Sequence, residues 1–101
     1  MRILFICNQN QNRSVTAEHV FRGKFQTKSA GLFNNTPVTE KQIAWADTIV
    51  VMESSQRQEL AKRFPQQFIQ KRILTLNIPD MYYRDQPELV SLLKHKMKRL
   101  L

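Results

Sequence analysis

The stretch ILFICNQNQNRSVTAEHVF, residues 3–21, joins an apolar run to an amide-rich loop and then to a helical pattern. Residues 2–7 are rich in Ile, Leu and Phe without polar alternation, which is typical of a strand buried on both faces of a parallel sheet. Over residues 14–25 apolar side chains return at helical spacing, and Ser14 suits an N-cap or first-turn position. A strand, a loop and a helix in this order predict the first unit of an α/β fold.

Strand and helix patterns alternate along the rest of the chain. We expect Thr39 to cap one helix, Ser54 or Ser55 to cap the next, and Pro65 to lie beyond the end of that helix. The order predicts right-handed crossovers and a mainly parallel sheet in a single domain spanning residues 1–101. The strand patterns cover residues 27–31, 47–53 and 71–78, and the helix patterns cover residues 39–46, 54–64 and the segment after Pro87.

The last helix pattern begins at Pro87, which is a favourable first helical residue. Its apolar stripe consists of Leu89, Leu93, Met97 and Leu100. The basic residues between 94 and 99 are expected to form a solvated face, with lysine stems lying over the apolar stripe.

The composition is that of an ordinary globular domain. The hydrophobic fraction is 42% and the charged fraction 24%, and only two glycines are present, which argues against an all-β fold built on tight turns. A single cysteine excludes an internal disulfide and favours a reducing compartment. We find no signal-peptide pattern and no membrane-length apolar run, so we expect a cytoplasmic protein without membrane contact. The net charge of +8 favours anionic partners, but the aromatic interleaving that would point to nucleic acid is missing.

The polar loop of residues 7–13 has two interpretations. In the simpler one, Cys7 is a buried free cysteine and Arg13 is solvated. In the other, the loop N–H groups and the N-terminal end of the following helix surround a tetrahedral anion, and Arg13 grips two of its oxygens. Cys7 then lies beneath the anion as a thiolate nucleophile. We expect the left-handed turns that glycine usually provides to be made by asparagines: Asn8, Asn10 and Asn12.

The position of the loop favours the anion site. Ligands of parallel sheets bind at the carboxyl ends of the strands. Three polar clusters are expected at that edge: Cys7, the segment from Glu53 to Ser55, and the segment from Asp80 to Asp85. No histidine stands at ligand spacing from a cysteine or carboxylate, so we expect no metal site.

The loop resembles the signature of the low-molecular-weight protein tyrosine phosphatases, Cys-x-Gly-Asn-x-Cys-Arg-Ser-Pro, at Cys7, Asn10, Arg13 and Ser14. The segments SAG at 29–31 and ADTIVVME at 46–53 are similar to that family's Ser-Ala-Gly turn and middle strand. IPDMYY and DQPELV most resemble the endings of a short bacterial branch of predicted protein tyrosine phosphatases. The resemblance spans nearly the whole chain and implies a Rossmann-like three-layer sandwich, with a central parallel sheet of about four strands flanked by helices.

The resemblance implies hydrolysis of phosphotyrosine or another aryl phosphate, carried by a protein or a small molecule, without metal or cofactor. Cys7 would attack phosphorus to give a phosphocysteine, and Arg13 would hold the equatorial oxygens. Asn10 would brace the loop, and the Ser14 hydroxyl would stabilise the thiolate. The other members of the phosphate-binding loop are Asn8, Gln9, Gln11 and Asn12.

The same family uses an aspartic acid to protonate the leaving phenolate and then to activate water. Asp80 is favoured, because DMYY matches the family's Asp-Pro-Tyr-Tyr, and Asp85 is the alternative general acid. Tyr82 and Tyr83 are expected to wall the pocket mouth, and Phe33 is a further candidate for a wall.

Three loop positions depart from the signature, since Gln9 replaces Gly, Asn12 replaces the second Cys and Val15 replaces Pro. If position 9 requires a positive φ, Gln9 favours the alternative of a phosphate-binding pseudo-phosphatase or regulatory module with little turnover. Arsenate reduction would need a thiol from outside the chain. The sequence does not indicate which oligomeric state the protein adopts.

Overall fold

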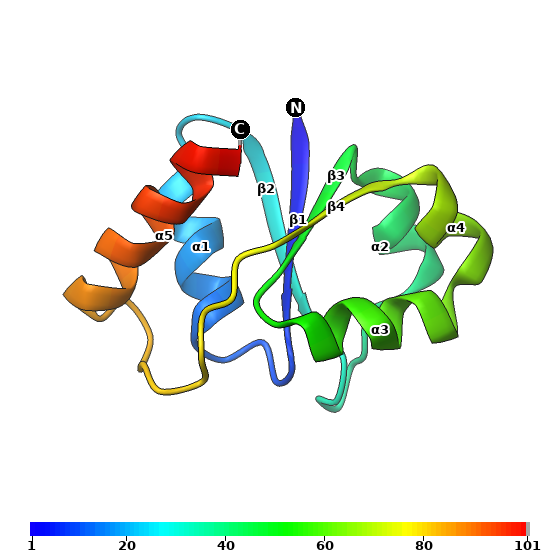
Figure 1. Cartoon of the computed structure of the whole chain (residues 1–101), viewed down its shortest axis with the longest axis horizontal. Coiled ribbons are helices and arrows are strands. Elements are labelled where there is room, and N and C mark those ends of the chain that lie inside the picture. Colours follow the sequence, from blue (N-terminus) through cyan, green and yellow to red (C-terminus); the bar gives the residue numbers. More distant parts are fainter. Residues whose placement is uncertain (101) are drawn as a thin grey trace.

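Four parallel strands form the centre of the computed structural model, which describes residues 1–100 (Figure 1). The sheet order is β2-β1-β3-β4, and the strands are β1 (Arg2–Cys7), β2 (Gln26–Gly31), β3 (Thr48–Val51) and β4 (Arg72–Thr75). Cys7 pairs with Gly31, and Val51 pairs with both Ile6 and Thr75. The carboxyl ends of all four strands therefore lie at one edge, as the sequence predicts.

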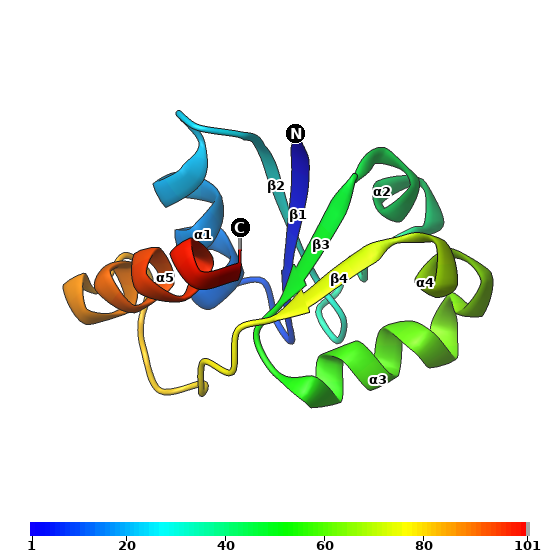
Figure 2. The same cartoon turned by 45° about the horizontal axis from the view of Figure 1, so that its top comes forward.

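Helices cover both faces of the sheet. On one face lie α1 (Arg13–Phe21) and α5 (Pro87–Leu100), and on the other lie α2 (Glu40–Trp45), α3 (Ser54–Arg63) and α4 (Pro65–Gln70) (Figures 1 and 2). The arrangement is the expected three-layer α/β sandwich. Among residues 1–100, no helix combines the length and the apolar character needed to cross a bilayer.

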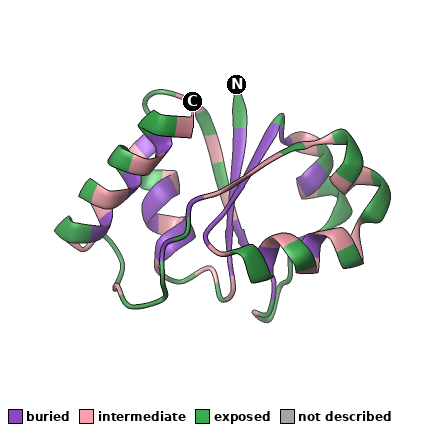
Figure 3. Cartoon of the chain, viewed as in Figure 1, coloured by how far each residue is buried: buried purple, intermediate pink, exposed green. Residues whose placement is uncertain are grey.

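The central strand β1 supplies both halves of the core, which explains its unbroken apolar run. Ile3 and Phe5 belong to the cluster under α1 and α5, whereas Leu4 and Ile6 belong to the cluster under α2 and α3. All four side chains are fully buried. In Figure 3 most of the central strand β1 is accordingly coloured as buried. Successive side chains of a strand point to opposite faces, so a strand in a middle layer must be apolar at every residue.

The first helix is shorter than its apolar spacing predicts. It ends at Phe21, and the residues after it turn into β2 instead of continuing the helix as far as Phe25. Gly23 weakens helical propensity here, and the N–H groups of Lys24 and Phe25 both donate to the carbonyl of Phe21. Phe25 nevertheless packs on the core, with its ring centroid 6.5 Å from that of Phe21.

The caps of the later helices agree with the prediction at one place and differ at another. Thr39 Oγ1 accepts from Gln42 N at 3.2 Å, and Gln42 Oε1 accepts from Thr39 N at 2.8 Å, so the predicted cap is confirmed. The N-cap of α3 is Glu53, and neither predicted serine holds that position. Pro65 does end α3, but as a favourable first helical residue it also begins α4, which the sequence reading missed.

The stripe of α5 allows a direct test of the core. Leu93 is fully buried against the sheet, so Leu93→Ala removes apolar contacts and leaves a cavity. We expect urea denaturation to show a free energy of unfolding lowered by about 2–5 kcal/mol. The exposed Ser91→Ala on the same helix should change it by less than about 0.5 kcal/mol. Equal effects of the two substitutions would contradict this assignment of the core face.

Candidate active site

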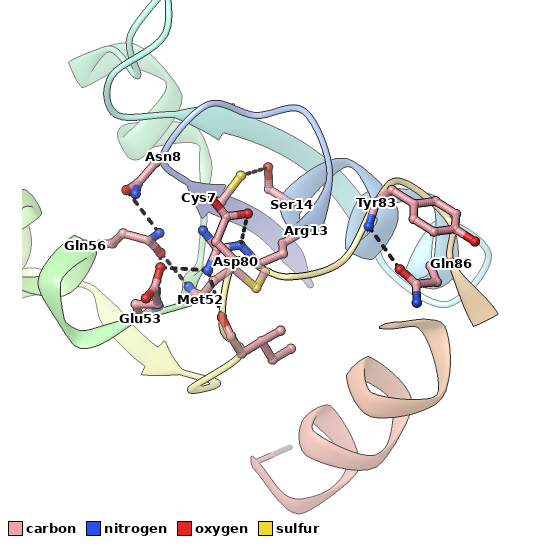
Figure 4. Close-up of polar contacts among 11 residues, drawn as sticks. Cys7, Asn8, Arg13, Ser14, Met52, Glu53, Gln56, Asp80, Tyr83 and Gln86 are labelled. Atoms are coloured by element: carbon pink, nitrogen blue, oxygen red, sulfur yellow. Dashed lines mark hydrogen bonds and ion pairs between the residues drawn. The ribbon is translucent and has the colours of Figure 1, made fainter. Parts of the chain in front are cut away.

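The three polar clusters meet at the carboxyl edge of the sheet (Figure 4). A small cavity of about 40 Å³ lies there, between the loop after β1 and the segment after β4. The residues that line it are Cys7, Gln9, Gln11, Asn12, Arg13 and Asp80. A thiol, a guanidinium and a carboxylate thus share one concavity.

Cys7 is buried at the last residue of β1, and its thiol enters a short hydrogen-bonded chain. Cys7 Sγ lies 2.9 Å from Ser14 Oγ, and Ser14 Oγ donates to Asn10 Oδ1 at 2.8 Å. Because the one hydroxyl proton of Ser14 points to Asn10, the thiol of Cys7 donates to Ser14 in this arrangement. Turning that proton toward sulfur would make Ser14 a donor to a Cys7 thiolate.

The backbone of the loop explains how it forms without glycine. Asn10 is the residue of the loop with a positive φ, at 54°, and asparagine tolerates this region better than most residues. The same expectation for Asn8 and Asn12 was wrong, because neither adopts a positive φ. Gln9 does not adopt one either, so its replacement of glycine causes no strain of this kind.

The loop leaves its backbone donors available. Within residues 1–100, the N–H groups of residues 9–15 donate to no other part of the chain, and the first backbone bond of α1 runs from Thr16 N to Asn12 O at 2.9 Å. Free N–H groups at a loop and helix start are suited to an anion.

Asn8 holds the loop to the rest of the molecule and does not line the cavity. Its carbonyl accepts from Leu32 N at 3.0 Å and from Phe33 N at 2.8 Å. Its side-chain oxygen accepts from Gln56 Nε2 at 3.2 Å.

Gln56 is a buried residue that the sequence reading missed. Its Oε1 accepts from Met52 N at 2.8 Å and from Glu53 N at 3.0 Å (Figure 4). The Gln56 amide therefore joins the residues after β3, the start of α3 and the loop of residues 7–13. The available signal was its place at the third helical residue, where Gln commonly bonds back to the cap.

Arg13 lies fully buried at the start of α1 and is fixed from two directions. Its Nη1 donates to Glu53 Oε2 and to the Ile78 carbonyl, each at 2.7 Å. Its Nε lies 3.8 Å from Asp80 Oδ1, and within residues 1–100 both of its hydrogen bonds come from Nη1, so Nη2 makes none. The expectation of a solvated Arg13 in the simpler interpretation is thus wrong, and the guanidinium presents a fixed, unused donor.

The two candidate acids have different surroundings. Asp80 lines the cavity and is 62% exposed at its side chain. Asp85 instead places Oδ1 3.3 Å from His19 Nδ1 on α1 and is not part of the cavity lining. Sequence spacing gave His19 no carboxylate partner, and the fold supplies one. Within residues 1–100, no group of three metal-ligating side chains accompanies this pair.

The aromatic candidates stand around the site and not inside it. Tyr82 packs partly on the core and faces a groove against α5, and Tyr83 is exposed. Neither lines the cavity, so their role as pocket walls stays a prediction. Phe33 adjoins the loop, since Gln9 Nε2 reaches its carbonyl at 3.5 Å, and the Arg63 guanidinium lies 4.9 Å from its ring centroid.

A larger cavity of about 280 Å³ lies elsewhere, between the end of α1 and the end of α5. Its floor is apolar and its rim is formed by lysines, including Lys94 and Lys98. The stems of these lysines beside Met97 match the solvated basic face predicted for α5. No thiol or carboxylate lines this cavity, so its chemistry does not compete with that of the smaller one.

No protein-family model matches the sequence, and no curated protein matches it by sequence. Solved structures do match it. A low-molecular-weight phosphotyrosine phosphatase from Vibrio cholerae O395 has a TM-score of 0.80 at 20% identity, over 99% of this chain and 94% of its own. The tyrosine phosphatase Wzb from Escherichia coli K30, solved with phosphate, has a TM-score of 0.77 at 22% identity, over 98% and 94%.

The YwlE arginine phosphatase from Geobacillus stearothermophilus gives a TM-score of 0.75 at 20% identity, over 98% of this chain and 92% of its own. These structures and the present one share an all-parallel α/β sandwich of nearly the same extent. The chain therefore has the fold of the low-molecular-weight protein tyrosine phosphatases.

The buried amide of Gln56 gives a test of how the loop is held. Gln56→Leu keeps the shape but leaves Met52 N, Glu53 N and the Asn8 side chain without their partner. We expect the free energy of unfolding to fall by about 2–4 kcal/mol in urea. The exposed Gln58→Leu on the same helix is the matched control, with an effect below about 0.5 kcal/mol. A Gln56 variant as stable as its control would contradict the bridging role.

Proposed function

We propose that this chain is a cysteine-dependent phosphatase that hydrolyses phosphotyrosine or another aryl phosphate through a phosphocysteine. The observation that carries the proposal is the shared cavity of Cys7, Arg13 and Asp80 under a loop with free N–H groups. The fold of the solved phosphatases supports it. The substrate is then a phosphorylated protein or a small aryl phosphate, met in the cytoplasm, and no cofactor takes part.

The first step transfers the phosphoryl group to sulfur. The Cys7 thiolate attacks phosphorus, the S–P bond forms, and the P–O bond to the leaving phenol breaks on the opposite side. The loop N–H groups and Arg13 Nη2 bind the equatorial oxygens, where negative charge gathers. Asp80, at the cavity mouth, gives its proton to the leaving oxygen, so that a phenol departs and not a phenolate.

The second step restores the enzyme. The Asp80 carboxylate takes a proton from a water molecule as that water attacks phosphorus and the S–P bond breaks. Inorganic phosphate leaves, and the Cys7 thiolate is regenerated. The Ser14 hydroxyl stabilises the thiolate in both steps by turning its proton from Asn10 to sulfur.

Replacement of the nucleophile tests the reaction. Cys7→Ser should lower the hydrolysis of 4-nitrophenyl phosphate by about 10³-fold or more, because the attacking thiolate is lost. Phosphotyrosine and phosphoarginine should be compared as substrates, and the proposal expects phosphotyrosine to be preferred. Equal rates for wild type and Cys7→Ser would exclude the mechanism.

A thermal shift with inorganic phosphate separates this proposal from the pseudo-phosphatase alternative. Binding to the native state alone raises the melting temperature with increasing phosphate concentration. A raised melting temperature without turnover by the wild type would favour the binding module. The finding that Gln9 has no positive φ removes the strain that had pointed toward that module.

The choice of general acid is decided by two substitutions. Asp80→Asn should lower kcat/KM for phenyl phosphate by about 100-fold, because the leaving phenolate loses its proton donor. Asp85→Asn keeps a residue that tolerates the positive φ of 59° at this position and should have the smaller effect. The reverse order of the two effects would assign the acid to Asp85.

A further inference from the structure

The segment that carries Asp80 belongs to no helix or strand. Residues 76–86 connect β4 to α5, and within this connection Ile78 is the upstream anchor of residues 79–86. Ile78 is fully buried, its N–H donates to Met52 O at 2.8 Å, and its carbonyl accepts from Arg13. Asp80 lies only two residues beyond this anchor, beside Cys7 and Arg13 (Figure 4).

The downstream end of the segment is fastened to the loop and to α1. Arg84 Nε donates to the carbonyl of Gln11 at 2.7 Å. Asp85 N donates to the buried Thr16 Oγ1 at 2.8 Å, and the Asp85 carboxylate meets His19 at 3.3 Å. The positive φ of Asp85, 59°, turns the chain so that its N–H and its carboxylate both face α1.

We propose that Arg84 and Asp85 are positioning residues that hold Asp80 at the cavity, an inference that rests on the proposed phosphatase function. Neither residue contacts the sulfur of Cys7 or is itself part of the cavity lining, so we expect them to act through Asp80. Arg84 has a particular place in this arrangement, because its acceptor Gln11 lines the cavity. One hydrogen bond therefore joins the loop of residues 7–13 to residues 79–86, the segment that carries Asp80.

The physical reason is the exposure of Asp80. Its carboxylate is 62% exposed, and its contact with Arg13 Nε is a loose 3.8 Å, so packing alone does not fix it. Fastening the segment on both sides of Asp80 limits the positions that this carboxylate can reach. A displacement of about 1 Å in a catalytic group can cost about 100-fold in rate.

The test uses two substrates that differ in their need for a proton. Phenolate is a strong base and leaves well only when protonated, whereas 4-nitrophenolate is a weaker base and needs the acid less. Arg84→Met removes the donor to Gln11 from an exposed position. We expect kcat/KM for phenyl phosphate to fall about tenfold and that for 4-nitrophenyl phosphate to fall much less.

Three further variants frame this result. Thr16→Val, which keeps the shape and removes the acceptor of Asp85 N, should change the substrate ratio in the same direction. Arg84→Lys retains a donor and should recover most of the lost rate with phenyl phosphate. Arg99→Met alters an exposed arginine of α5 and should leave the ratio at its wild-type value. An unchanged ratio in both Arg84→Met and Thr16→Val, or an equal loss with both substrates, overturns the proposal.

Hydrogen exchange separates a failure of this inference from a failure of the proposed function. Arg84→Met and Thr16→Val should speed amide exchange within residues 79–86 and leave α5 unaffected. Unchanged exchange overturns the anchoring whether or not the protein turns over substrate. Faster exchange in a protein without Cys7-dependent turnover supports the anchoring of residues 79–86. The same result contradicts the phosphatase function and the role of Asp80 as its general acid.

Discussion

The buried guanidinium of Arg13 is stable only because acceptors surround it, since an unpaired charge in a protein interior is costly. One acceptor is the carboxylate of Glu53, the N-cap of α3 just after β3, and another is the carbonyl of Ile78 after β4. Arg13 itself follows β1. The charge can therefore be satisfied only when these three segments end at the same edge of the sheet. The same contacts that satisfy the buried charge of Arg13 also bring the residues of the cavity together. The stability of the fold and the geometry of the site therefore depend on the same interactions.

Much of this architecture is legible in the sequence, because it depends on local patterns. The apolar run of β1 indicates a strand in a middle layer, and the spacing of Leu89, Leu93 and Met97 indicates the buried face of α5. Cys7 and Arg13 stand out by their place between a strand and a helix. The errors arose where two local preferences competed. Phe25 continues a helical spacing that Gly23 interrupts, and Pro65 both ends one helix and begins another.

The contacts that support the site could not be predicted from local sequence patterns. Gln56 and Asn8 are 48 residues apart, and Arg84 and Gln11 are 73 residues apart, so no periodicity connects them. Amide and guanidinium side chains are also common on surfaces, and nothing in their identity shows that a carbonyl waits within reach. Asp80 and Asp85 are the same residue type, and only their neighbours in the folded structure distinguish them. Sequence could indicate the chemistry of the site, whereas the groups that orient it follow from tertiary structure.

The central position of β1 has a consequence for biosynthesis. The strand β1, which ends at Cys7, is translated before both of its neighbours in the sheet, and its partner β3 begins only at Thr48. The backbone acceptor of the Arg13 side chain, the carbonyl of Ile78, is present only after residue 78 has been synthesised. On the ribosome, the thiol of Cys7 therefore remains uncovered while most of the domain is still being synthesised. Oxidants can reach the uncovered thiol during that interval. Because of the strand order, the yield of protein with a reduced Cys7 therefore depends on the redox potential of the compartment in which the chain folds.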